Sequence, residues 1–220
     1  MSILFKRIIV STIIMMALLL IFIPSKNSIL EVFRLTDEPN IIIKGNFGMS
    51  LTIDLSYADA KFIEWLNEEK SPYPLLMVDP DLLERSPTLV KVIKAKNIPI
   101  GLLGRNSDFY EVNPSQLEKD ISTFNSIMKQ SPLWFRTRDY VFLPDVTKVL
   151  WKEQINMLAA SKILSDSKDL KLSKGDIISI PYHQEERLPL KEIDRLIQNN
   201  SFQPIEETIF GYSVKTKKTP

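Results

Sequence analysis

Cysteine is absent from this chain of 220 residues, and histidine occurs once, at position 183. Without cysteine the protein forms neither disulfides nor thiolate zinc sites. Because His183 is alone, the chain also lacks any site that needs two imidazole ligands from one molecule. These two absences exclude the commonest protein zinc centres.

An excess of basic residues is also missing. The chain has 28 Lys and Arg against 27 Asp and Glu, and Lys6 and Arg7 belong to an apolar N-terminal segment. A nucleic-acid binder normally shows a basic excess, so we expect no nucleic-acid partner. With 44% hydrophobic and 25% charged residues, the composition is typical of a globular domain.

The N-terminus contains one long apolar run. Residues 8–23 read IIVSTIIMMALLLIFI, without a charge. As a helix this run spans about 24 Å, and residues 3–5 extend it toward the bilayer core of about 30 Å. With Lys6 and Arg7 before it, the run predicts a single-pass membrane anchor over residues 1–24, with the N-terminus cytoplasmic. The alternative is a cleaved signal peptide, which would make the protein secreted. Both interpretations place the rest of the chain outside the cytoplasm.

The remaining chain divides into three parts by composition. Residues 25–40 are polar and mixed and are predicted to be a tether, residues 41–212 a folded domain, and residues 213–220 a polar tail. Apolar runs predict strands at 41–44, 49–54, 74–78, 98–103, 133–136 and 177–180. Helical spacing predicts helices at 59–70, 80–96, 113–129, 145–154 and 189–198, with caps at Asn113 and Asp145. The segment 155–164 fits either a helix or a strand.

Alternation of strands and helices favours a parallel α/β sheet or barrel. In such folds the active site lies at the carboxyl ends of the strands. The polar residues at those ends are Asp54, Tyr57, Asp79, Asp81, Arg105, Asp108, Arg136, Arg138, Tyr182 and His183. A pocket of acids, arginines, tyrosines and one histidine is suited to a carbohydrate chain.

Several segments resemble the NodB-type polysaccharide deacetylases. Residues 73–101, YPLLMVDPDLLERSPTLVKVIKAKNIPIG, resemble a strand, helix and turn of that family. MSLTID resembles the strand of its T-F-D-D-G-P motif, PLWFR the strand of its R-P-P-Y-G motif, and KGDIISIP the strand of its L-x-H motif. The resemblance covers residues 41–209 and implies a distorted (β/α) barrel.

The chemistry that the resemblance implies is hydrolysis of acetyl groups on glycans, an amide hydrolysis in the N-acetyl case. Such enzymes use a divalent metal held by one Asp and two His, with a second Asp as base and a further His as acid. In this chain the base position falls on Asp54, but the metal-ligand positions fall on Leu55, Leu103 and Ser107. We therefore expect no metal cofactor and interpret the chain as a degenerate member of the family, a pseudoenzyme.

Each remaining candidate residue has two interpretations. Asp54 is a residual base or a buried acid paired with Arg136, the arginine of the R-P-P-Y-G motif. His183 lies two residues after Pro181, which occupies the L-x-H histidine position, and is a residual acid or a loop residue. Arg136 is otherwise a ligand clamp. Tyr57 and Tyr182 are candidates for stacking on sugar rings, although aromatic residues more often pack in cores.

Three functions remain open at this point. The first is a binding module for a cell-envelope glycan or an envelope protein, using Tyr57, Arg136 and Tyr182. The second is an active carbohydrate deacetylase, or another hydrolase, with a site rebuilt around Asp54 and His183. The third is a scaffold whose cleft is filled by side chains such as Leu55 and Leu103.

Overall fold

Short apolar runs of the chain become parallel strands of one curled sheet. The computed structural model describes residues 38–68, 72–165, 171–184 and 187–211, and within them the sheet has eight strands. The strands are β1 (Ile41–Ile42), β2 (Ser50–Leu55), β3 (Leu75–Val78), β4 (Ile100–Leu103), β5 (Trp134–Arg136), β6 (Asn156–Leu158), β7 (Lys162–Ile163) and β8 (Ile177–Ile180). Their order is β1-β6-β5-β4-β3-β2-β8-β7, and each neighbouring pair is parallel.

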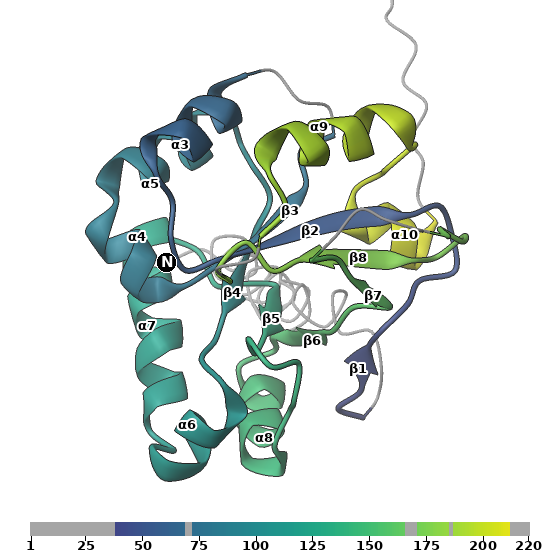
Figure 1. The fold of residues 1–220 in the computed structure, drawn as a ribbon. Helices are drawn as coiled ribbons and strands as arrows, with labels where there is room; N and C mark the ends of the chain where they lie inside the picture. The colour runs from purple at the N-terminus through teal and green to yellow at the C-terminus, as the bar shows by residue number, and fades with distance from the viewer. Residues whose placement is uncertain (1–37, 69–71, 166–170, 185–186, 212–220) are drawn as a thin grey trace, which may run out of the picture. The chain divides into compact units, whose positions relative to one another are not determined.

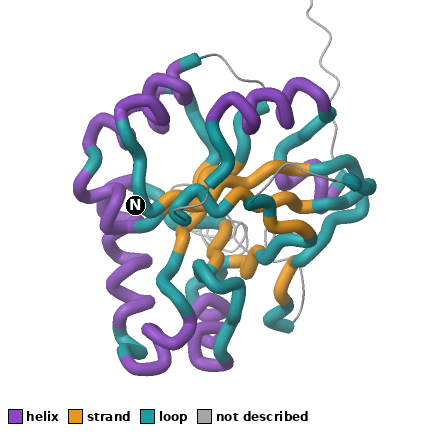
Figure 2. The backbone as a smooth tube through the Cα atoms, in the orientation of Figure 1, coloured by secondary structure: helices purple, strands orange, loops and turns teal. Residues whose placement is uncertain are grey.

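Helices surround the outer face of the sheet. They are α3 (Ala60–Asn67), α4 (Pro80–Arg85), α5 (Pro87–Ala95), α6 (Ser107–Val112), α7 (Gln116–Met128), α8 (Pro144–Lys152), α9 (Leu190–Asn199) and α10 (Ile205–Phe210). Figure 1 shows β2 in the middle of the sheet, between β3 and β8. In Figure 2 the strands gather at the centre, with helices on the left, upper and lower sides of the view. The fold is a parallel half-barrel, and β1 and β7 stand at its two ends.

The two faces of the sheet have different chemistry. Along β2, Leu51, Ile53 and Leu55 belong to the apolar core, which also contains helix residues such as Phe62 and Leu89. Side chains alternate along a strand, so Thr52 and Asp54 point to the opposite, inner face. The outer face therefore binds the helices by hydrophobic packing, and the inner face carries polar groups.

Prolines divide the predicted helix 80–96 into two. Asp79 begins α4 by accepting hydrogen bonds from the backbone N–H groups of Asp81 and Leu82. Pro87 has no N–H group and cannot continue that helix, so α4 ends at Arg85 and Pro87 starts α5. The prediction of a single helix was wrong at this point.

Other local predictions also differ from the structure. The predicted strand 41–44 is shortened to β1 (Ile41–Ile42), and it does not pair with β2: β1 pairs with β6, whereas β2 pairs with β3 and β8. The predicted caps Asn113 and Asp145 are not caps, because α7 begins after Ser115 and α8 after Leu143. The ambiguous segment 155–164 forms the strands β6 and β7.

The predicted membrane anchor, residues 1–24, and most of the tether lie outside the described residues. Within the described ranges, no helix has the length and apolarity that crossing a membrane requires.

Candidate functional site

A buried ion pair stands at the centre of the inner face. Nη1 of Arg136 lies 2.7 Å from Oδ1 of Asp54, and both side chains are 0% exposed. Arg136 ends β5, and Asp54 is the second-last residue of β2, so the parallel strands bring the two to the same end of the sheet. The predicted pairing of these two residues is confirmed.

Arg136 is held by several groups besides Asp54. Nη1 lies 2.7 Å from Oγ1 of Thr52 and 2.9 Å from Oγ of Ser179. Nε and Nη2 donate to the carbonyl oxygens of Leu158 and Ala159, both at 2.9 Å. Through these hydrogen bonds, the guanidinium of Arg136, on β5, is connected to β2, β8 and the end of β6. Charge-assisted hydrogen bonds of this kind are the strong ones in a protein interior.

The second carboxylate oxygen of Asp54 is occupied as well. Oγ of Ser179 donates to Oδ2 of Asp54 at 2.9 Å, and the hydroxyl of Tyr140 lies 2.8 Å from the same oxygen. Tyr140 reaches this position with a left-handed backbone, φ 60°. Burial, followed by the negative charge of Asp54, raises the pKa of Tyr140, so the phenol stays protonated and able to donate. Both oxygens of the Asp54 carboxylate are therefore bonded, and its side chain has no exposed surface.

The three metal-ligand positions of the resembled family do not converge. Leu55 is part of the apolar core on the outer face, whereas Leu103 pairs in register with Arg136 on the inner face. Ser107 begins α6, where its backbone N–H and its hydroxyl both donate to Oδ2 of Asp139. Although partial burial raises the pKa of Asp139, its hydrogen bonds from Ser107 lower it overall. Among the described residues, no group of three His, Asp or Glu side chains is arranged to hold a metal ion.

His183 lies at the edge of this centre. Burial lowers the pKa of His183, and this effect outweighs the negative charge of Asp54, which raises it. Nδ1 is buried without a hydrogen-bond partner among the described residues. No hydrogen bond joins the imidazole to the Asp54 carboxylate within the described structure, where Arg136, Tyr140 and Ser179 contact both oxygens.

The two predicted stacking residues have different surroundings. Tyr182 is 4% exposed; its ring centroid lies 4.8 Å from that of Phe62, and the Arg187 guanidinium lies 4.6 Å from it. Tyr57 is 52% exposed, and the same guanidinium lies 5.5 Å from its ring. Of these two rings, only that of Tyr57 is open to solvent.

Two further arginines follow strands at the same end of the sheet. Arg138 pairs with Asp79, the capping residue of α4. Nη2 of Arg105 lies 3.0 Å from Asp81, and its Nε lies 3.4 Å from Asp120. Each cation is therefore balanced by a carboxylate. Nε of Arg138, like Nδ1 of His183, is buried without a hydrogen-bond partner among the described residues.

Sequence reasoning missed the roles of Ser179 and Tyr140 around Asp54. Ser179 is a polar residue inside the apolar strand IISI, and such a residue signals a buried partner. In the sequence, nothing at Tyr140 indicates a contact with Asp54. Its position depends on the loop after β5, for which the sequence contains no comparable signal.

Solved structures with a similar fold exist, at low sequence identity. No family model and no curated protein matches the sequence. Among solved structures, a family 4 carbohydrate esterase from Bacillus anthracis is similar with a TM-score of 0.61 and 16% identity, over 84% of this chain and 93% of that one. A peptidoglycan N-acetylglucosamine deacetylase has a TM-score of 0.59 and 16% identity, over 77% and 92%.

A third similar structure is a pseudoenzyme of carbohydrate esterase family 4 from Bacillus anthracis. Its TM-score is 0.59 at 15% identity, over 74% of this chain. The chain spans 64% of the length of that pseudoenzyme. Together these likenesses confirm the expected fold, the curled half-barrel of the NodB-type polysaccharide deacetylases.

Proposed function

We propose that this domain is a non-catalytic binding protein built on the polysaccharide-deacetylase fold. The observation that carries the proposal is the state of Asp54. Its two oxygens are bonded to Arg136, Tyr140 and Ser179, and the carboxylate is fully buried. A general base has to reach the water or proton that it acts on, and this carboxylate serves instead as the counter-ion of a structural arginine.

The surroundings of Leu55 support the same proposal. A carboxylate there would enter the apolar core under the helices rather than approach Leu103 and Ser107. Metal-dependent deacetylation would therefore need a different backbone path at the end of β2, in addition to three changed side chains. The alternative is a hydrolase rebuilt from Asp54 and His183. It is not favoured, because both carboxylate oxygens of Asp54 are already bonded to other side chains.

The ligand that we propose is an uncharged stretch of a cell-envelope glycan. Tyr57 offers an exposed ring, and the Arg187 guanidinium lies 5.5 Å from its centroid. Sugar rings pack on aromatic faces, and sugar hydroxyls and acetamide carbonyls can bond a guanidinium. Because Arg138 and Arg105 are already paired with carboxylates, an anionic ligand is not favoured.

The place of action in this proposal follows from the N-terminal sequence. An apolar anchor at residues 1–24 and a tether at residues 25–40 would hold the domain at the outer side of a cell membrane. If the segment is cleaved as a signal peptide, the protein is secreted instead. One of the proteins with this fold is a peptidoglycan deacetylase, which makes peptidoglycan the first glycan to test.

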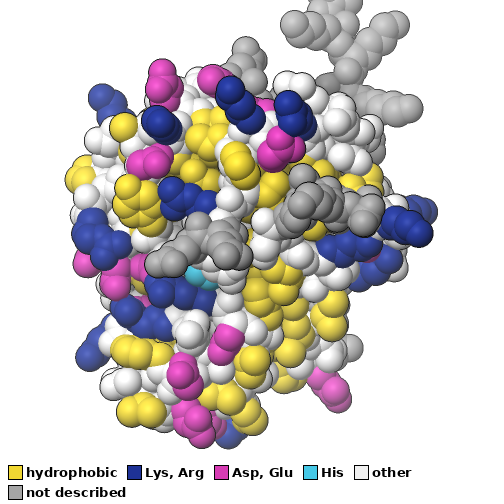
Figure 3. Space-filling model, viewed as in Figure 1, with side chains coloured by type: hydrophobic (Ala, Val, Ile, Leu, Met, Phe, Trp, Pro, Cys, Tyr) yellow, Lys and Arg dark blue, Asp and Glu magenta, His cyan; other side chains and the backbone are white. Residues whose placement is uncertain are grey.

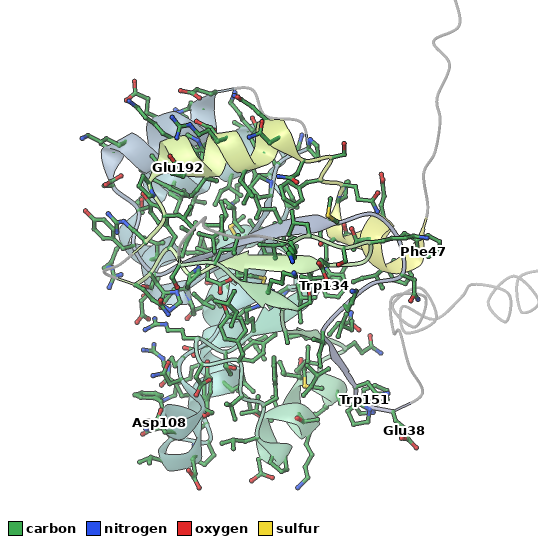
Figure 4. All side chains as sticks on the ribbon, turned by 45° about the vertical axis from the view of Figure 1, so that its right-hand side comes forward. Glu38, Phe47, Asp108, Trp134, Trp151 and Glu192 are labelled. Atoms are coloured by element: carbon green, nitrogen blue, oxygen red, sulfur yellow. The ribbon has the colours of Figure 1, made fainter. Side chains whose placement is uncertain are left out.

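A sedimentation assay with insoluble peptidoglycan tests binding by the full-length chain. We expect the chain to co-sediment and Tyr57→Ala to weaken binding about fivefold or more, a loss of about 1 kcal/mol. Phe47→Ala is the matched control, since Phe47 is also exposed but precedes β2 at the opposite end of the sheet. Figure 4 labels Phe47. Equal loss in both variants, or no co-sedimentation, would contradict glycan binding at this edge.

Calorimetric titration of zinc tests the absence of catalysis separately. We expect no stoichiometric binding at micromolar zinc and no acetate release from N-acetylglucosamine oligomers. Stoichiometric binding that disappears in His183→Ala, with acetate release, would establish a rebuilt active site instead.

A further inference from the structure

Two hollows of about 310 and 230 Å³ are lined by residues of α7 and α8 and of the segments beside them, and neither is lined by Asp54 or Arg136. The larger hollow is lined by Tyr110, Glu111, Pro114, Leu117, Leu143, Pro144, Asp145, Val146 and Val149. The smaller one is lined by Glu118, Ile121, Ser122, Asn125 and Glu153. We call the two hollows together the α7–α8 groove.

The dimensions of the groove suit a protein segment. On α7 its walls extend from Leu117 to Asn125, and along α8 from Asp145 to Glu153, the residue that follows the helix. At about 1.5 Å per residue, each wall is about 12 Å long, or slightly more than two helical turns. A groove of this length accommodates two turns of a docked helix, which place two or three side chains on one face.

The floor and one end of the groove are apolar. Leu117 and Val146 are buried side chains of the floor, and Val149 and Leu143 are half-buried. The larger hollow takes Tyr110 and Glu111 from α6, and the next residue of that helix, Val112, is 79% exposed. Apolar side chains gathered around a concave surface are typical of an interaction site.

The charges that line the groove have one sign. Glu111 and Asp145 border the larger hollow and Glu118 and Glu153 the smaller, and neither hollow has a lining Lys or Arg. Asp145 is paired with Lys148 at 2.9 Å, a contact in which both side chains remain largely exposed. The lower part of the face in Figure 3 shows acidic side chains among hydrophobic ones, together with a few basic side chains. Figure 4 labels Asp108, a further acidic residue of α6.

We infer that the α7–α8 groove binds a basic amphipathic helix of a partner protein. The apolar face of that helix lies on Leu117, Val146 and Val149, and its Lys or Arg side chains reach the four carboxylates at the rim. Complementary charge favours this partner over an acidic or neutral one and speeds its association. This groove does not include Tyr57, the residue proposed above to bind the glycan, so the two proposed sites are separate.

The probe for this inference is a synthetic helical peptide made only of leucine and lysine, titrated calorimetrically into the full-length chain. We expect saturable binding that weakens as salt is added. A peptide of the same pattern with glutamate in place of lysine should not bind. The double variant Glu111→Lys/Glu153→Lys should weaken binding about tenfold, which corresponds to about 1.4 kcal/mol.

A matched double variant controls for the change in net charge. Glu64→Lys/Glu84→Lys alters the charge equally, and its residues are exposed on α3 and α4. It should change the affinity less than about twofold. A third variant, Val149→Glu, changes the apolar wall and should abolish binding, with circular dichroism showing that the fold is retained.

Three outcomes would overturn the inference. In the first, the control variant weakens binding as much as Glu111→Lys/Glu153→Lys, which would mean attraction by net charge alone. In the second, the glutamate peptide binds equally, which would remove the role of charge. In the third, the chain associates with itself through this groove. Analytical ultracentrifugation would then show a dimer that Val149→Glu dissociates.

Discussion

Asp54→Asn is the substitution that most directly tests the structural interpretation of the central ion pair. Asparagine keeps the shape of the side chain and removes its charge. Arg136 would then be a fully buried cation without the carboxylate that faces it at 2.7 Å. An amide N–H₂ group would also replace one acceptor oxygen, next to the donors of Arg136 or of Tyr140 and Ser179.

The expected loss of stability is large for a single substitution. Breaking a buried ion pair by removing one partner costs about 3–5 kcal/mol. For a domain of this size, about 2–4 °C of melting temperature corresponds to each kcal/mol, so the midpoint should fall by about 6–20 °C. An exposed control substitution such as Glu64→Gln should move it by less than about 2 °C, because surface substitutions stay within about 0.5 kcal/mol.

Urea unfolding, followed by circular dichroism, measures the effect in a double-mutant cycle with Arg136→Met. Because the two residues are in contact, the double variant should be more stable than the sum of the single losses by about 1–3 kcal/mol. A loss below about 1 kcal/mol for Asp54→Asn, or strictly additive losses, would refute the argument that this carboxylate is a structural counter-ion.

Three smaller predictions concern residues around this centre. Leu55→Asp should destabilise the domain more than Leu55→Ala, which costs about 2–5 kcal/mol, because the carboxylate enters the apolar core, and calorimetry should detect no gain of zinc binding. Tyr140→Phe should cost about 1–3 kcal/mol in urea unfolding by removing a hydroxyl from Asp54 and Ser179; an unchanged midpoint would contradict this contact. Burial lowers the pKa of His183 from 6.5, so the unfolded chain binds this proton more readily and stability should fall as pH drops below about 6.5. NMR titration should show the lowered pKa directly, and His183→Gln should remove that part of the pH dependence.

Much of the strand pattern could be predicted from the sequence, because buried parallel strands are short apolar runs. The contact between Asp54 and Arg136 was one of the two interpretations of Asp54, and it followed from the resemblance to the deacetylase family. The break at Pro87 could also have been predicted, because a proline in a helix interior removes a hydrogen bond. The continuous apolar periodicity on both sides of Pro87 favoured a single helix instead.

The remaining differences depend on contacts between distant segments. The helices α6 and α10 have six residues each, too few for a clear helical period. The contact of Tyr140 with Asp54 joins residues 86 positions apart, through a left-handed backbone at a residue other than glycine or asparagine. The burial of Tyr182 against Phe62 depends on how α3 packs on the sheet. None of these is encoded in a local pattern.

The strand order also bears on how the chain reaches its folded state. The pairings from β2 through β6 join strands that follow one another in the chain, but the other neighbour of β2 is β8. The hydroxyl of Ser179 and the carboxylate of Asp54 come from positions 125 residues apart. During synthesis from the N-terminus, one edge of β2 therefore stays unpaired until β8 has emerged, and an unpaired edge is a site for aggregation. Pairing over such a separation is slow, so the docking of β8, which also supplies the last hydroxyl to Asp54, is the step that completes the polar centre of the inner face.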